Sequence, residues 1–158
     1  MKKAQVEIRS CVGRKPKVSE NEIPKLIYLK NVVKETFRLH PPATLLLPRE
    51  SMRPCKIGGY DIPAKTRIHV NAWAIGRDPK TWKNPEEFYP ERFEDNDVDF
   101  RGNHYELIPF GAGRRICPGL TMGSTNIEFT LANLLHCFDW GLPDGMQIED
   151  ISLEPYCS

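Results

Sequence analysis

Residues 110–119, FGAGRRICPG, combine the side chains in this sequence that are best suited to chemistry. Gly111 and Gly113 free the backbone, two arginines follow, and Cys117 stands directly before Pro118, which suits the first turn of a helix. Unpaired N–H groups and the macrodipole at a helix N-terminus stabilise a negatively charged sulfur. The sequence therefore predicts Cys117 as a metal-binding thiolate.

The glycines and the second arginine of this loop suit a flat cofactor that carries carboxylates. Gly113 and Gly119 let the backbone pass close to a planar group, and the guanidinium of Arg115 matches a carboxylate. Ile116 occupies the place of the last glycine of a dinucleotide-binding loop, and no Gly-Lys-Ser/Thr follows, so neither common phosphate-binding loop fits. The loop alone is also compatible with an inert, buried thiol.

Two further motifs carry charges. In Glu35-Thr36-Phe37-Arg38 the i, i+3 spacing places a carboxylate and a guanidinium on one helical face. Taken alone, this pair also fits a solvated ion pair, which contributes about 0 to 1 kcal/mol. The second motif, Pro90-Glu91-Arg92-Phe93, lies in a long stretch without helical or strand periodicity.

Together the three motifs resemble those of the cytochrome P450 family. The family's cysteine-ligand loop, F-x-x-G-x-R-x-C-x-G, is matched at all its fixed positions, by Phe110, Gly113, Arg115, Cys117 and Gly119. The resemblance runs from residue 1 to about residue 150 and is strongest to plant microsomal members. It implies that Cys117 binds the iron of haem b, iron protoporphyrin IX. The other loop residues expected to contact the haem are Phe110, Gly111, Gly113, Arg115 and Gly119.

The resemblance also assigns roles outside the cysteine loop. It implies a buried charge cluster that holds this loop in place, formed by Glu35, Arg38 and Arg92. Arg49, in LLLPRES, is expected to reach a haem propionate, although a plain edge strand with a surface arginine fits the same residues. The expected substrate contacts are Ala43, Thr44 and Leu45. Beyond the haem ligand, no residue of this chain is expected to be catalytic.

Family membership further implies an NADPH- and dioxygen-dependent monooxygenase that hydroxylates a small hydrophobic organic substrate. Its electrons are expected from NADPH-cytochrome P450 reductase. Lys30, Lys34 and Arg114 are candidates for meeting an acidic electron donor, and a solvated basic face is the alternative. Full-length members lie in the endoplasmic reticulum membrane. This sequence shows no apolar run long enough for an anchor, so the chain itself is expected in the cytoplasm or in an unassigned compartment.

Composition narrows the alternatives. The formal net charge is +1, so no global field favours nucleic acid. The five cysteines are scattered and odd in number, and none forms a C-x-x-C pair, which argues against a disulfide framework or a zinc site. Hydrophobic residues make up 40% of the chain, which is typical of a globular protein.

Periodicity predicts the elements that position these residues. Residues 2–12 repeat an apolar side chain every four positions, and Gly13 follows as a helix end. Ser19 and Glu22 have capping-box spacing and predict a second helix that must end before Pro41. The remaining predictions are short strands over 45–48, 56–62 around a Gly58-Gly59 turn, and 66–70, a brief helix over 71–76, an irregular stretch over 77–110, and a helix from Pro118 to Phe138.

The predicted fold is mainly α with a small antiparallel β-sheet, an α+β class, in a single incomplete domain over residues 1–158. We find no A/G-G-x-D/E-T-T element, which in the family delivers protons to bound dioxygen. The chain alone is therefore expected to be an inactive C-terminal part of a monooxygenase. One alternative is a non-catalytic haem- or partner-binding fragment from a truncated gene. Another is a structural protein in which Cys117 is inert.

Overall fold

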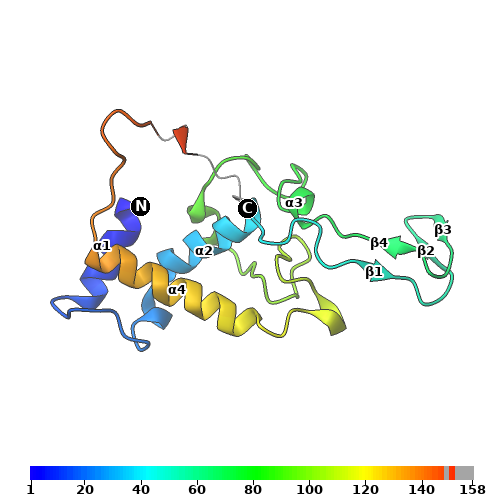
Figure 1. The fold of residues 1–158 in the computed structure, drawn as a ribbon, viewed down its shortest axis with the longest axis horizontal. Coiled ribbons are helices and arrows are strands. Elements are labelled where there is room, and N and C mark those ends of the chain that lie inside the picture. The colour runs from blue at the N-terminus through cyan, green and yellow to red at the C-terminus, as the bar shows by residue number, and fades with distance from the viewer. Residues whose placement is uncertain (148–149, 152–158) are drawn as a thin grey trace.

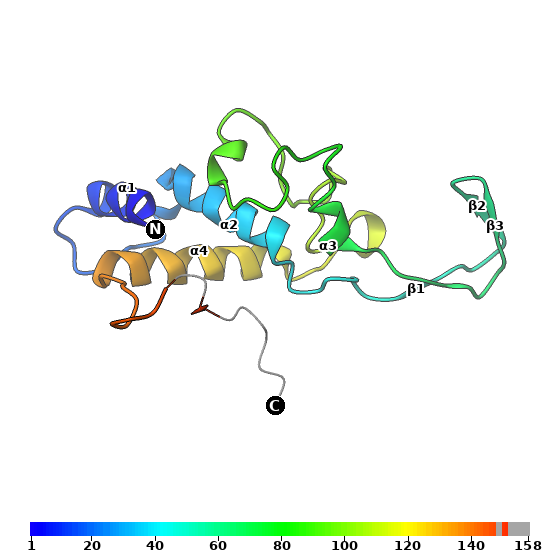
Figure 2. The same ribbon diagram turned by 90° about the horizontal axis from the view of Figure 1, so that it is seen from above.

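The computed structural model describes residues 1–147 and 150–151. Three helices form one side of the molecule, and the strands extend from the other side (Figures 1 and 2). The predicted class, mainly helical with short antiparallel strands, is confirmed. In chain order the elements are α1 (Lys2–Val12), η1 (Ile23–Lys25), α2 (Ile27–Leu39), β1 (Arg49–Glu50), β2 (Cys55–Ile57), β3 (Tyr60–Ile62), β4 (Arg67–Ile68), α3 (Ala72–Ile75), η2 (Pro90–Phe93), η3 (Gly113–Arg115) and α4 (Leu120–Cys137).

Helix α1 packs against α2 and α4 through the apolar face that its periodicity predicts. Ala4, Ile8 and Val12 are all buried in one apolar cluster with residues of η1, α2 and α4. The helix ends at Gly13, whose φ of 66° is accessible to glycine at little cost. Because the predicted face is the buried one, burial of α1 accounts for its helical state.

The prediction for the second helix is correct at its end and wrong at its start. The helix stops at Leu39, before Pro41, as expected. It begins only at Ile27, because Leu26 adopts a φ of −85° and a ψ of 77°, which interrupts the turn formed by η1. Glu22 does accept hydrogen bonds from the Ser19 backbone N–H and hydroxyl, but this closes a local turn ahead of the helix.

The turn between Ser19 and Glu22 makes the stability of the folded state depend on pH. Hydrogen bonds from Lys15 and Ser19 lower the pKa of Glu22 from its ordinary value to about 2. A carboxyl whose pKa is lower in the folded state stabilises the fold above its unfolded pKa, and loses this effect as pH falls through the folded value. We expect Glu22→Gln to flatten the stability profile between about pH 4.5 and 2. Urea unfolding at several pH values in this range measures the free energy of unfolding, and Glu20→Gln, at an exposed position, is the control. If Glu22→Gln and Glu20→Gln give the same pH profile, the role assigned to Glu22 is wrong.

The strands are shorter than predicted and form two separate antiparallel pairs. The Gly58-Gly59 turn joins β2 to β3 as a hairpin, with Lys56 opposite Asp61. The other pair aligns Arg49 of β1 with Ile68 of β4. The strand predicted over 45–48 is wrong, because residues 44 and 45 form a turn and Leu46 has a φ of 50°, outside the extended region.

The irregular stretch over 77–110 is confirmed, apart from the short helix η2. Its aromatic residues pack with α2 in a second apolar cluster that includes Phe37, Trp82, Phe93 and Phe100. The helix predicted from Pro118 to Phe138 begins at Leu120 and not at Pro118, because residues 118 and 119 form a turn. Within the described residues, no helix combines the length and apolar character needed to span a bilayer.

Candidate functional site

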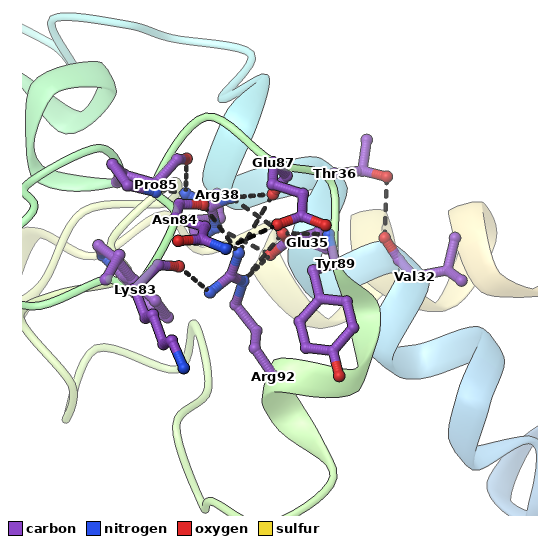
Figure 3. A network of polar contacts seen from close by, with 12 residues as sticks. Val32, Glu35, Thr36, Arg38, Lys83, Asn84, Pro85, Glu87, Tyr89 and Arg92 are labelled. Atoms are coloured by element: carbon purple, nitrogen blue, oxygen red, sulfur yellow. Dashed lines mark hydrogen bonds and ion pairs between the residues drawn. The ribbon is translucent and has the colours of Figure 1, made fainter.

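Helix α2 and the irregular segment meet at a buried carboxylate. Glu35, fully buried, accepts hydrogen bonds from Arg38 Nε at 2.8 Å and Arg38 Nη2 at 2.9 Å. It also accepts from Arg92 Nε at 2.9 Å and from the Tyr89 backbone N–H at 2.8 Å. The structure thus brings Glu35, Arg38 and Arg92 together, as Figure 3 shows. A carboxylate held by two guanidinium groups and a backbone N–H has its hydrogen-bonding capacity satisfied despite burial.

The two arginines also organise backbone that has no regular secondary structure. Arg38 Nη1 donates to the carbonyl oxygens of Gly76 and Pro85, both at 2.6 Å. Arg92 donates to the carbonyl of Lys83 at 2.9 Å, and both arginines donate to that of Glu87 (Figure 3). Carbonyl groups outside helices and sheets lack the backbone donors of a regular element, and those that leave water need other donors. The cluster therefore supplies hydrogen bonds that a helix or sheet would supply elsewhere.

Aromatic contacts connect α2 to the cysteine loop. The Phe37 ring lies edge-on to Phe100, with ring centroids 5.2 Å apart, and to Phe110, at 5.1 Å. The Phe110 carbonyl then accepts the backbone N–H of Cys117 at 3.0 Å. Phe37 lies between Glu35 and Arg38 in sequence, so the same turn of α2 contributes to the charge cluster and to the aromatic contacts.

The cysteine loop itself is exposed. Cys117 is a free, exposed thiol, and its carbonyl accepts the N–H of Leu120, the first residue of α4, at 3.3 Å. Gly111 and Gly113 have φ values of 74° and 70°, so both positions favour glycine. A Cβ at Gly119 would lie 3.8 Å from the Cys117 sulfur, so this glycine borders the thiol directly.

On one side, the loop borders a cavity of about 400 Å³ that is lined by three arginines. It is lined by Arg49 and Leu46 from the segment after α2, and by Gly111, Arg114 and Arg115 of the loop. Arg49 Nη2 donates to the Arg115 carbonyl at 3.2 Å. Among the described residues, no carboxylate lies within ion-pair distance of Arg49 or Arg115. Both cations are therefore available to an acidic ligand.

Cys117 lines a second cavity, of about 650 Å³, between α2, α4 and the irregular segment. Lys30 and Lys34 of α2 and Glu128 of α4 also line it, whereas Arg114 lies at the first cavity. Burial lowers the pKa of Lys34 and raises that of Glu128. This cavity is thus a charged depression beside the cysteine.

None of the three expected substrate contacts lines either of these two cavities. Ala43, Thr44 and Leu45 are exposed in the turn after α2, where the Thr44 carbonyl accepts the Trp73 N–H at 3.2 Å. Only the adjacent Leu46 reaches the first cavity. Sequence reasoning missed the contacts of Phe37 and the carbonyl ligands of the arginines. Leu29, Val33 and Phe37 stand at helical spacing, which indicated burial of Phe37, but no sequence pattern indicated the carbonyls.

A haem fits the residues that are present. The thiol of Cys117 is exposed and carries the soft sulfur that iron accepts. Arg49 and Arg115 are cations without a carboxylate partner in the described ranges, which suits two propionates. A Cβ at Gly113 would meet no atom within 4 Å, so open space adjoins the loop.

Comparison with known proteins gives one consistent result. A family model described as Cytochrome P450 matches residues 1–156. The chain is 64% identical over 155 residues to 4-hydroxyphenylacetaldehyde oxime monooxygenase of Sorghum bicolor. The aligned region covers 98% of this chain and 29% of that protein. It is 60% identical over 154 residues to cytochrome P450 71B34 of Arabidopsis thaliana, with 98% and 31% covered.

Solved structures agree with the sequence relatives. A zebrafish cytochrome P450 solved with progesterone superposes with a TM-score of 0.75 and 34% identity, over 85% of this chain and 30% of that one. The same coverage and TM-score are found for a zebrafish cytochrome P450 solved with abiraterone. The chain therefore spans about 30% of the length of the curated relatives that it matches.

Proposed function

The chain belongs to the cytochrome P450 family, of which the sorghum relative is named as a monooxygenase, and from that premise we propose that the chain binds haem b through Cys117. The parent reaction that we propose is NADPH- and dioxygen-dependent hydroxylation of a small hydrophobic organic substrate. The sorghum relative is named for an oxime of 4-hydroxyphenylacetaldehyde, which is a small aromatic molecule. When bound, the haem supplies dioxygen activation, for which thiolate ligation is suited.

One observation carries this proposal: the exposed Cys117 lies in a loop that also presents Arg115, next to Arg49. In the proposed site the cysteine sulfur binds the iron, and the two arginines bind the propionates. Gly111 and Gly113 keep the loop backbone free of side chains where a flat group approaches. Phe110 holds the Cys117 N–H and packs against Phe37, which orients the loop.

The same framework assigns supporting roles to the other predicted residues. Glu35, Arg38 and Arg92 fix the irregular segment and, through Phe37, the position of the loop. Ala43, Thr44 and Leu45 contact substrate in the parent enzyme, on an exposed turn that leads into Leu46 and Arg49. We place all of these residues in one domain over residues 1–158, and the parent protein in the endoplasmic reticulum membrane.

Haem titration tests the proposal directly. We expect the chain to bind one haem, and the reduced, carbon monoxide-bound form to show a strongly red-shifted, thiolate-type Soret band. The double variant Arg49→Ala/Arg115→Ala should retain the band and weaken haem binding, because it removes cations and leaves the sulfur in place. Binding without the red-shifted band would contradict cysteine ligation by this chain.

NADPH-cytochrome P450 reductase is the electron donor that we propose, and the cavity beside Cys117 is its docking surface. We expect Lys30→Glu/Lys34→Glu to slow association with the reductase about tenfold at low salt, because steering of an acidic partner is lost. Association rates at low and high salt measure the effect, which should shrink as salt screens the charges. Lys80→Glu, at an exposed site outside this cavity, is the control, and an equal effect there would contradict the assignment.

A non-catalytic haem- or partner-binding protein is the second candidate, because the exposed Cys117 with Arg49 and Arg115 suffices to hold a haem without turnover. The two candidates differ in turnover. If the haem-loaded chain, mixed with reductase, NADPH and dioxygen, neither consumes NADPH above the rate of reductase alone nor forms an oxidised product, binding is its function. Coupled product formation would instead assign the monooxygenase reaction to this chain.

A further inference from the structure

Helix α1 touches α2 at its start, far along the helix from the charge cluster. The Glu7 carboxylate accepts the backbone N–H of Tyr28 at 2.7 Å and that of Leu29 at 3.0 Å. Both residues lie in the first turn of α2, where the N-cap residue Leu26 makes no side-chain cap. Glu7 therefore caps α2 from another helix, and its charge faces the positive end of the helix dipole.

The same helix holds η2 through Lys3. Lys3 Nζ donates to Glu91 at 2.8 Å and to Glu94 at 3.1 Å, and lies 4.2 Å from the Tyr28 ring centroid. The Tyr28 hydroxyl donates to the same Glu91 oxygen at 3.2 Å. The Lys3 ammonium also lowers the pKa of Glu91, which keeps this carboxylate charged. Glu91 precedes Arg92 in the chain, so Lys3 is anchored next to a member of the cluster.

These contacts close a triangle of three elements. Glu7 joins α1 to α2, Lys3 joins α1 to η2, and the ion pair between Glu35 and Arg92 joins α2 to η2. The distance between Glu35 and Arg92 depends on how α2 lies against η2. Helix α1 contacts both of these elements, so it constrains that arrangement without contributing to the cluster.

We propose that Glu7 and Lys3 are positioning residues for the cysteine loop. They fix α2 against η2, and α2 in turn holds the loop through Phe37 and Phe110. The effect passes through packed side chains to the Cys117 N–H, which the Phe110 carbonyl accepts. This set of contacts supports the positioning of the loop by Glu7 and Lys3. The consequence for haem binding rests on the proposed function.

Amide hydrogen exchange of the full chain tests this inference without haem. We expect Glu7→Ala to speed exchange at the Cys117 amide about fivefold, as loss of a helix cap suggests. Lys3→Ala should act in the same direction. The amide of Ala132, fully buried in α4, should be unchanged, because the loop loosens without global unfolding. Glu7→Gln keeps one side-chain oxygen that can accept a hydrogen bond, so it should speed exchange at the Cys117 amide less. It replaces Glu7→Ala in the test if Glu7→Ala does not fold.

Matched controls separate positioning from general destabilisation. Glu20→Ala and Lys2→Ala remove the same side chains at exposed positions nearby. Val12→Ala weakens the apolar packing of α1 and should speed the Cys117 and Ala132 amides alike. The inference is overturned if Glu7→Ala and Lys3→Ala behave like the exposed controls, or if they speed Ala132 as much as Cys117.

A second readout connects the inference to haem. In chain loaded with haem, Glu7→Ala should lower the fraction that shows the thiolate-type carbon monoxide band, and Glu20→Ala should not. If the unmodified chain shows no such band, the proposed haem ligation fails. Hydrogen exchange at Cys117 still decides whether Glu7 and Lys3 position the loop.

Discussion

We expect Cys117→Ser to abolish the red-shifted Soret band of the reduced, carbon monoxide-bound chain. A serine hydroxyl has almost the same size as the thiol but does not supply a soft, electron-rich sulfur to iron. Cys117 lies in an exposed loop beside Gly119, so the substitution meets no packing obstacle and should leave the fold intact. The measurement is the carbon monoxide difference spectrum at equal haem loading.

The chain provides a matched control for this substitution. Cys137 is also an exposed free thiol, but it lies at the other end of α4. Cys137→Ser should therefore leave the band unchanged. A thiolate-type band that survives Cys117→Ser and disappears with Cys137→Ser would move the proposed ligand to the other cysteine. If both variants keep the thiolate-type band, the haem iron is bound by another residue.

The largest loss of stability is expected from Glu35→Ala. The substitution leaves the guanidinium groups of Arg38 and Arg92 buried without their carboxylate, and the Tyr89 N–H without its acceptor. Breaking a buried ion pair in this way costs about 3 to 5 kcal/mol, which is a large part of the 5 to 15 kcal/mol that stabilises a typical domain. Urea unfolding followed by circular dichroism should show a much lower midpoint or no cooperative transition.

Asp61→Ala is the control for an exposed ion pair. Asp61 Oδ1 lies 3.3 Å from Lys56 Nζ, and the side chains of Lys56 and Asp61 are 72% and 82% exposed. Removal of the Asp61 carboxylate should cost under about 1 kcal/mol, because water already solvates both charges. If the two substitutions destabilise the chain equally, burial does not set the cost, and the cluster loses its structural role.

Glu35→Ala also probes how the cluster acts on the loop. The cluster binds the carbonyls of Gly76, Lys83 and Pro85, so its loss should release the irregular segment first. Haem binding would then weaken through Phe100 and Phe110, which pack on Phe37 of the same helix. Cys117→Ser, by contrast, should alter the spectrum and leave the unfolding midpoint near its original value.

Local patterns determined where most elements lie. An apolar residue every four positions in 2–12 predicts α1, and the Gly58-Gly59 turn predicts the hairpin, because each signal acts within a few residues. The cysteine loop was likewise recognisable from its own ten residues. The i, i+3 spacing of Glu35 and Arg38 by itself favoured a solvated surface pair, and only the family resemblance indicated burial.

Tertiary structure decided what depends on contacts between distant segments. The start of α2 was misplaced because its cap, Glu7, comes from another helix, 21 residues before Tyr28. The carbonyl oxygens that surround Arg38 and Arg92 carry no sequence signature, since every residue has one. Burial of these charges depends on how α2, η2 and the irregular segment pack together. The sequence alone determined which residues were available, and packing decided which of them became partners, because a buried charge persists only where donors and acceptors converge on it.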